Sequence, residues 1–230
     1  MAPLKPLRFP VDDQNEVSAL LEIPPDSRQL LVLAHGAGAG MHHPFLEHLS
    51  AELAAVHIAT LRYQFPYMEY RRRIPDPPKL LTATVIAAVR TATTAAPNLP
   101  VFAAGKSMGA RMTSQAAAQG SLNSVKGLIF FGFPLHPPNR PGTQRAQHLA
   151  EVAQPMLFLQ GTRDAFASLH LLRRVCAQLA PLATLRIIDS ADHSFHVLKS
   201  AKRNDAEILQ DLAHTTSIWA NTIAPSTSNQ

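Results

Sequence analysis

The chain has 230 residues, of which 46% are hydrophobic and 16% charged. This composition excludes a disordered chain, and the length suits one domain better than two. We therefore expect a single domain over residues 1–230, with a frayed tail from about residue 224. The lone cysteine, Cys176, excludes an intramolecular disulfide and the cysteine-rich zinc modules.

The net charge is +5, but the basic residues are scattered along the chain. The densest basic runs, Arg71–Arg73 and Arg173–Arg174, carry no interleaved aromatic stripe, which predicts solvated basic faces and no specific nucleic-acid binding. The first residues lack the apolar core of a signal sequence. The apolar window Leu80–Val89 is too short to span a bilayer. We expect a soluble, cytoplasmic protein with no membrane partner.

Apolar runs of strand length alternate along the chain with segments of helical period. The predicted strands are Ser18–Ile23, Leu30–Ala34, His57–Arg62, Val101–Ala104, Gly127–Phe131, Met156–Leu159 and Thr184–Ile188. Helical faces are predicted around Leu46, Leu49 and Leu53, around Leu171 to Leu179, and around Ile208 to Trp219. The alternation predicts an α/β fold: a mostly parallel central sheet with helices on both faces. Ligands bind such sheets at the carboxyl ends of the strands.

Five of the ten glycines fall in two short stretches, each directly after a predicted strand. The second stretch, Gly105-Lys106-Ser107-Met108-Gly109, has the form G-x-S-x-G, and an alanine-rich helical run follows it. In this strand–turn–helix context the serine projects from a strained turn, and the flanking glycines remove side chains that would collide. We predict that Ser107 is a nucleophile, the alternative being a chance Gly-Ser-Gly turn.

The first stretch runs from His35 to Gly40 and can expose backbone N–H groups beside the serine. Acyl-transfer chemistry needs two such donors for its oxyanion. We predict that they come from Ala37 and from Met108, the residue after the serine. The alternatives are a phosphate-binding loop or a bare turn, but neither phosphate-loop spacing nor dinucleotide-site spacing is present. His35 is predicted to be a packed residue that shapes this loop.

A serine nucleophile needs a histidine base and an acid that orients the histidine. Asp164 and His193 each follow a predicted strand and come in the expected order after Ser107. His196 and His136 are rivals for the base, and Asp189 and Asp192 are rivals for the acid. Asp192 is the less suitable acid, because side chains of adjacent residues rarely face each other. His42-His43 is a tempting metal pair, but no further ligand cluster accompanies it, so we expect no metal and no cofactor.

At these residues the chain resembles the α/β-hydrolase superfamily, in particular its dienelactone-hydrolase-related group. Within that group it is similar to the testis-expressed and NSL-complex-subunit-like hydrolase-domain proteins and their bacterial relatives. The segments that carry the resemblance are 33–39, 62–68, 105–111, 131–138, 160–164 and 192–195. The resemblance implies Ser107 as nucleophile, Asp164 as acid and His193 as base. Dienelactone hydrolase itself uses a cysteine, so serine at position 107 points to ordinary ester chemistry.

The segment between Phe131 and Met156 is too short and proline-rich for a cap domain, so the site is expected to be open. We predict pocket walls from strand-end loops, formed by Met41, His42, Tyr63, Tyr67, Phe133 and His136; the alternative for several of them is core or rim packing. The resulting prediction is a serine hydrolase that cleaves small-molecule esters or thioesters through an acyl-enzyme. The alternatives are a peptidase or acyltransferase on the same residues, or a non-catalytic interaction scaffold.

Overall fold

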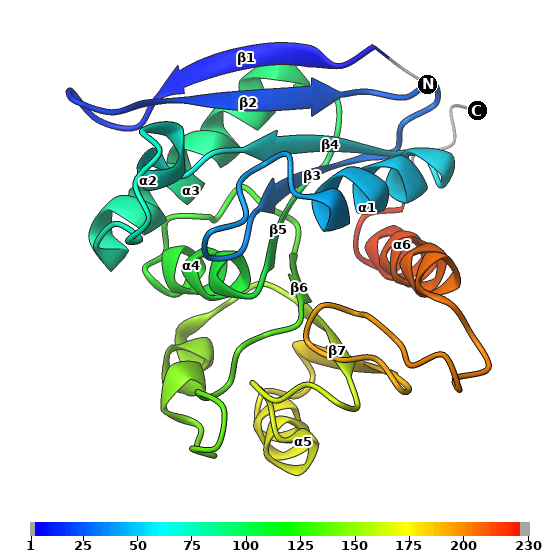
Figure 1. Ribbon diagram of the computed structural model, residues 1–230. Helices are drawn as coiled ribbons and strands as arrows, with labels where there is room; N and C mark the ends of the chain where they lie inside the picture. The colour runs from blue at the N-terminus through cyan, green and yellow to red at the C-terminus, as the bar shows by residue number, and fades with distance from the viewer. Residues whose placement is uncertain (1–2, 226–230) are drawn as a thin grey trace.

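The computed structural model describes residues 3–225, so most of the predicted frayed tail lies outside the described residues. Its centre is one eight-stranded sheet, with strand order β1-β2-β4-β3-β5-β6-β7-β8 (Figure 1). The strands are β1 (Lys5–Pro10), β2 (Glu16–Glu22), β3 (Gln29–Ala34), β4 (Ile58–Tyr63), β5 (Val101–Lys106), β6 (Leu128–Phe131), β7 (Met156–Gly161) and β8 (Ala183–Ile188). The neighbours β4, β3, β5, β6, β7 and β8 pair in parallel. Strand β2 pairs antiparallel with both of its neighbours, β1 and β4. The predicted mostly parallel sheet is confirmed.

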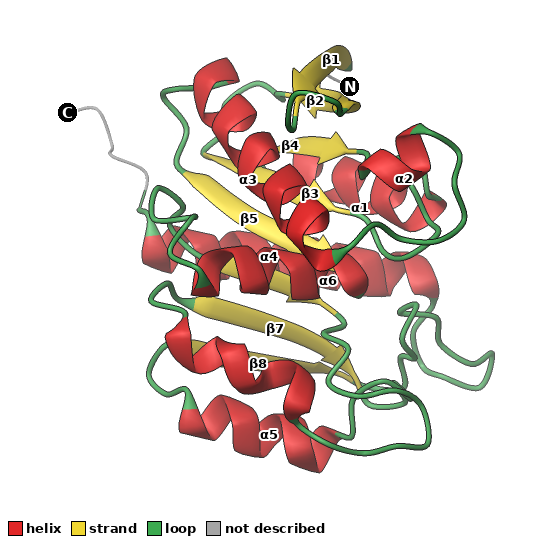
Figure 2. Cartoon of the chain, turned by 90° about the vertical axis from the view of Figure 1, so that its left-hand side faces the viewer, coloured by secondary structure: helices red, strands yellow, loops and turns green. Residues whose placement is uncertain are grey.

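Helices cover both faces of the sheet (Figure 2). They are α1 (Pro44–Ala55), α2 (Pro66–Glu69), α3 (Pro78–Ala95), α4 (Met108–Ala118), α5 (Leu169–Gln178) and α6 (Asp205–Ile223), with a 3₁₀ helix η1 (Gln144–Glu151). Helices α1 and α6 pack on one face, and α3, α4 and α5 pack on the other. No helix within residues 3–225 is long and apolar enough to cross a membrane, and the cytoplasmic location stays a prediction.

The continuous apolar runs of the central strands follow from this double covering. In β3, Leu30 and Val32 belong to the hydrophobic cluster under α3 and α4, whereas Leu31 and Leu33 belong to the cluster under α1 and α6. Successive side chains of a strand point to opposite faces, so a strand covered on both faces needs apolar residues throughout.

The segment that joins β6 to β7 contains only one short helical element, η1. It forms no separate helical layer over the strand ends (Figure 2). The predicted absence of a cap is confirmed, and the carboxyl ends of β3, β5, β7 and β8 meet at one edge of the sheet.

Candidate active site

Ser107 lies on a sharp turn between β5 and α4. Its backbone has φ 53° and ψ −113°, a conformation that a non-glycine residue adopts only under strain. Two glycines make the turn possible. A Cβ on Gly109 would lie 2.5 Å from the carbonyl oxygen of Ala34, and one on Gly105 would collide with the backbone of Gly109. The predicted strand–turn–helix setting of the serine is therefore present.

His193 and Asp164 lie beside this serine at the ends of β8 and β7. The Oγ of Ser107 is 2.8 Å from Nε2 of His193, and Nδ1 of His193 is 2.7 Å from Oδ2 of Asp164. The carboxylate faces Nδ1, so that nitrogen carries the proton of the neutral ring and Nε2 is free to accept from the serine. The structure thus brings together, in one hydrogen-bonded chain, the three residues that the sequence singled out.

The Asp164 side chain is 0% exposed, whereas that of His193 is 20% exposed. The carboxylate also accepts hydrogen bonds from the backbone N–H of Phe166, at 2.7 Å, and from the side-chain amide of Gln160. The Phe166 ring packs against the imidazole with 4.4 Å between ring centroids. These contacts fix the carboxylate and the ring plane. The sequence predicted no role for Gln160 or Phe166, because the pattern around a triad does not indicate which residues support the acid or pack against the base.

The rival residues have other partners. His196 pairs with Asp205 on the surface, and His136 is buried with Nε2 at 2.9 Å from the hydroxyl of Ser168. The Oδ1 atom of Asp192 accepts the backbone N–H groups of Ser194 and His196, as expected for a turn residue.

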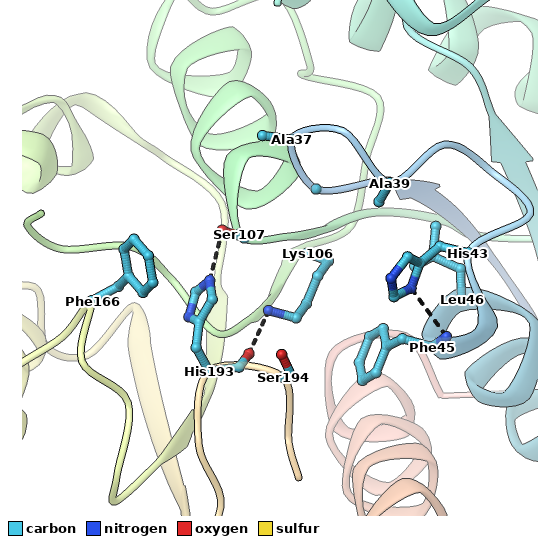
Figure 3. A pocket seen from close by; sticks show the side chains of 11 residues that line it. Ala37, Ala39, His43, Phe45, Leu46, Lys106, Ser107, Phe166, His193 and Ser194 are labelled. Carbon is cyan, nitrogen blue, oxygen red and sulfur yellow. Dashed lines mark hydrogen bonds between the residues drawn. The ribbon is translucent and has the colours of Figure 1, made fainter. Parts of the chain in front are cut away.

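The loop after β3 lies opposite the serine, and its Gly36, Ala37 and Ala39 line the same cavity (Figure 3). Within residues 3–225, the backbone N–H groups of Ala37 and Met108 have no hydrogen-bond acceptor. The Met108 amide begins α4, where the helix leaves its first N–H groups unpaired and favours negative charge. Both predicted donors thus lack an acceptor; Ala37 lines the cavity, and Met108 directly follows the cavity-lining Ser107.

His35 is buried at the base of this loop. Its Nδ1 is 2.7 Å from the carbonyl oxygen of Gly36, and its Nε2 accepts the backbone N–H of Phe65 at 3.1 Å. Burial lowers the pKa of His35 to about 4, so the ring is neutral at pH 7. The predicted role of His35 as a packed residue that shapes the loop agrees with these contacts.

The cavity beside Ser107 has a volume of about 350 Å³. Its walls are lined by Gly36, Ala37, Ala39, His43, Phe45, Leu46, Lys106, Ser107, Phe166, His193 and Ser194 (Figure 3). Phe45, at the start of α1, stacks on Phe195 with 5.7 Å between centroids. The wall is thus mainly apolar, and Lys106 is its one lysine or arginine.

The prediction of the pocket walls needs correction, because none of the six predicted residues lines this cavity. Tyr63 and Phe133 are fully buried in the core under α3 and α4, and His136 is buried against Ser168. Those three side chains point into the body of the fold.

The other three predicted wall residues lie in the loop between β3 and α1 or beside it. Met41 is buried, and its backbone bonds to Gln64 and Arg62. His42 is exposed and faces Glu47. Tyr67 is buried behind the loop, where its hydroxyl accepts the backbone N–H of Gly38 at 2.9 Å. Proximity to a strand end in the sequence therefore did not predict which side chains face the cavity.

A sequence model of the alpha/beta hydrolase domain matches residues 27–221. The chain belongs to the α/β-hydrolase family. Among solved structures it is similar to a dienelactone hydrolase from Anabaena variabilis, with 20% identity, a TM-score of 0.77, and coverage of 96% of this chain and 98% of that one. It is also similar to an α/β serine hydrolase without a lid from Xanthomonas campestris, with 20% identity, a TM-score of 0.74, and coverage of 99% and 98%.

A third similar structure is an α/β serine hydrolase homologue from Coxiella burnetii, with 16% identity, a TM-score of 0.72, and coverage of 95% and 97%. At these identities the likeness concerns the fold. Family membership and fold together support a hydrolase.

In residues 3–225 no group of three or more His, Cys, Asp or Glu side chains is arranged to hold a metal ion.

Proposed function

We propose that this α/β-hydrolase cleaves small carboxylic esters or thioesters through a catalytic triad of Ser107, His193 and Asp164. The observation that carries the proposal is the continuous chain from the serine Oγ through both imidazole nitrogens to a buried carboxylate, with links of 2.8 and 2.7 Å. A hydroxyl is a poor nucleophile at neutral pH unless an adjacent base takes its proton. The contacts of His193 with Ser107 and Asp164 support its role as that base.

In the first half of the reaction, Ser107 Oγ attacks the substrate carbonyl carbon while its proton passes to Nε2 of His193. The resulting oxyanion accepts hydrogen bonds from the N–H groups of Ala37 and Met108, and Asp164 stabilises the imidazolium. Collapse of the tetrahedral intermediate breaks the carbon–oxygen or carbon–sulfur bond. The leaving group takes the proton from His193, and the acyl group stays on Ser107.

Water completes the cycle. Nε2 of His193 takes a proton from a water molecule, which attacks the acyl-enzyme carbonyl and forms a second oxyanion at the same two donors. Collapse releases the carboxylic acid and returns the proton to Ser107. The apolar cavity of about 350 Å³ suits a small neutral or aromatic acyl group.

The test is covalent labelling with a fluorophosphonate, together with hydrolysis of p-nitrophenyl acetate. We expect wild type and Ser194→Ala to be labelled and active, and Ser107→Ala to be unlabelled and inactive. Ser194 is a matched control, because it lines the same cavity but takes no part in the hydrogen-bonded chain. Equal labelling of wild type and Ser107→Ala would overturn the proposal.

A further inference from the structure

Lys106, the last residue of β5, directly precedes Ser107 and lines the cavity. Its ammonium Nζ donates a hydrogen bond to the backbone carbonyl oxygen of His193 at 2.6 Å (Figure 3). The same Nζ lies over the rings of Phe45 and Phe195, 5.8 and 5.6 Å from their centroids. One side chain therefore links the strand that carries the nucleophile to the loop that carries the base.

Burial of this ammonium is unfavourable. Loss of hydration lowers the pKa of Lys106 to about 8, although the nearby carboxylates of Asp164 and Asp192 oppose the effect. The other titratable groups on the cavity are His43 and His193. Within residues 3–225 no carboxylate forms an ion pair with Nζ, whose polar partner is the His193 carbonyl. An apolar side chain would fill this space at a lower cost, so the contact with His193 needs an explanation.

The His193 loop is held by bonds within its own turn and by backbone bonds to Arg163 after β7 and to Asp205 at the start of α6. Its internal bonds are those of a turn, from Phe195 N–H to the Asp192 carbonyl and from Asp192 N–H to the His196 carbonyl, both 3.0 Å. These bonds shape the loop but do not connect it to Ser107. A charge-assisted bond from the residue next to Ser107 makes that connection.

Other groups bound the contact between Lys106 and His193 on two sides. Gly132, which follows β6 with φ 68°, passes so close that a Cβ there would lie 3.3 Å from Nζ of Lys106 and 3.5 Å from Nδ1 of His193. The aromatic faces of Phe45 and Phe195 bound the ammonium on another side. On these two sides the neighbouring groups limit how far Nζ can move away from the His193 carbonyl.

We propose that Lys106 is a positioning residue, whose ammonium holds the backbone of His193 so that Nε2 stays within hydrogen-bond distance of Ser107 Oγ. The inference rests on the proposed serine hydrolase function. His193 must take and return a proton at Nε2 twice in each cycle, and a displacement of about 1 Å in a catalytic group can lower the rate about 100-fold. Lys106 limits that displacement without touching the reacting atoms.

The first experiment compares Lys106→Met with wild type on p-nitrophenyl acetate. Methionine keeps an unbranched side chain but removes the donor. We expect kcat to fall about 10- to 100-fold while KM changes by less than about 2-fold, because the base is displaced and the apolar walls remain. Lys79→Met is the matched control: Lys79 is an exposed lysine on α3, and its loss should leave kcat unchanged. Circular dichroism checks that both variants fold.

Chemical rescue separates positioning from a general packing defect. Lys106→Cys should lose activity as Lys106→Met does, and treatment with 2-bromoethylamine should restore most of kcat by rebuilding an ammonium of nearly lysine length. The native Cys176 is buried, and burial raises the pKa of its thiol to about 12, so it should not react. Wild type treated in the same way is the blank.

The wild-type pH profile gives a readout that needs no variant. As pH rises through about 8, Lys106 loses its proton and its charge-assisted bond to His193 weakens, so kcat should fall. In Lys106→Met this alkaline decrease should be absent. A wild-type kcat that does not fall up to about pH 10, close to the ordinary lysine value, would contradict the proposal.

The outcomes for the function and for the inference are distinct. A wild type that a fluorophosphonate does not label at Ser107 overturns the proposed function and the inference together. A labelled, active wild type overturns only the inference if Lys106→Met keeps its kcat, if the loss appears in KM alone, or if aminoethylation of Lys106→Cys restores nothing.

Discussion

The hydroxyl of Tyr67 accepts the backbone N–H of Gly38 at 2.9 Å, so that a residue on α2 holds the loop between β3 and α1 from behind. The backbone N–H of Tyr67 in turn donates to the buried carboxylate of Asp76 at 2.7 Å, and Arg72 pairs with that carboxylate. Tyr67 therefore does not form the cavity wall but is a support for the loop that carries Ala37.

Tyr67→Phe should weaken catalysis through this support. The substitution removes the acceptor of the Gly38 N–H, a part-buried hydrogen bond of a kind whose net loss typically costs about 0.5–1.5 kcal/mol. Because the loop must hold the Ala37 N–H at the oxyanion, we expect kcat to fall about 10-fold with little change in KM. Steady-state kinetics on p-nitrophenyl acetate measures both constants.

Tyr70→Phe is the control for this change. Tyr70 lies directly after α2 and is 47% exposed. Among the described residues its hydroxyl forms no hydrogen bond to the loop between β3 and α1, unlike that of Tyr67. It should keep wild-type kinetics. An unchanged kcat in Tyr67→Phe would show that the Gly38 bond does not position the loop.

Much of the fold could be predicted because the central strands carry a strong signal. Strands covered on both faces must be apolar throughout, and these runs are short and separated by helical segments. The structure adds β1, which the sequence did not indicate. Its residues include Pro6 and Pro10 and are mostly exposed, which an antiparallel edge strand tolerates. Helix α3 was also missed, because the Leu80–Val89 window was considered only as a membrane span.

The candidate site was also predicted only in part. Ser107, Asp164 and His193 could be placed because each follows a strand, and parallel strands end at the same edge of the sheet. The cavity walls could not be placed, because they depend on side-chain directions and on helix packing. Phe45 reaches the site from α1, and Phe166 reaches it from the loop after β7. A single lysine before the serine likewise forms no pattern that predicts its contact with His193.

Acid should destabilise the fold through His35. Folded His35 has a pKa of about 4, whereas an unfolded histidine titrates near about 6.5. Between these values the unfolded state binds the additional proton, so the free energy of unfolding decreases as pH falls, by about 2 kcal/mol from this group at pH 5. Protonation would also put a hydrogen on Nε2, which now accepts the Phe65 N–H. Two donors would then face each other, and this hydrogen bond would be lost.

Urea unfolding of wild type and His35→Gln at pH 7 and pH 5 measures this contribution. The decrease between the two pH values should be smaller in His35→Gln by about 2 kcal/mol. His148 is also held neutral, since burial lowers its pKa to about 4, so a part of the wild-type decrease should persist in the variant. His214→Gln, at an exposed position on α6, is the control and should follow wild type. Identical decreases in wild type and His35→Gln would contradict this assignment.

Short acyl chains should be the better substrates. No cap layer stands over the strand ends, and the cavity beside Ser107 has a volume of about 350 Å³. A long acyl chain would extend beyond these walls into water, so that its extra methylenes would contribute little to transition-state binding. Values of kcat/KM for a series of p-nitrophenyl esters from acetate to palmitate test this. A strong preference for the long chains, with activation at a lipid interface, would argue against a site without a cap.

Asp164, and not Asp192, should be the carboxylate that orients the base. Asp164 Oδ2 lies 2.7 Å from Nδ1 of His193, whereas Oδ1 of Asp192 accepts two backbone N–H groups of its own turn. Asparagine at position 164 could present an amide to Nδ1 and so favour the wrong tautomer of the imidazole. We therefore expect Asp164→Asn to lower kcat by about 10³- to 10⁴-fold while the fold survives.

Asp192→Asn is the matched comparison. An asparagine oxygen can still accept the N–H groups of Ser194 and His196, so the turn should persist and a substantial share of kcat should remain. Both variants are measured on p-nitrophenyl acetate after circular dichroism has shown native structure. Fluorophosphonate labelling should be much slower in Asp164→Asn and close to wild type in Asp192→Asn, because labelling depends on the same activation of Ser107. If Asp192→Asn were the inactive variant and Asp164→Asn the active one, the hydrogen bond between Asp164 and His193 would not be the one that orients the base.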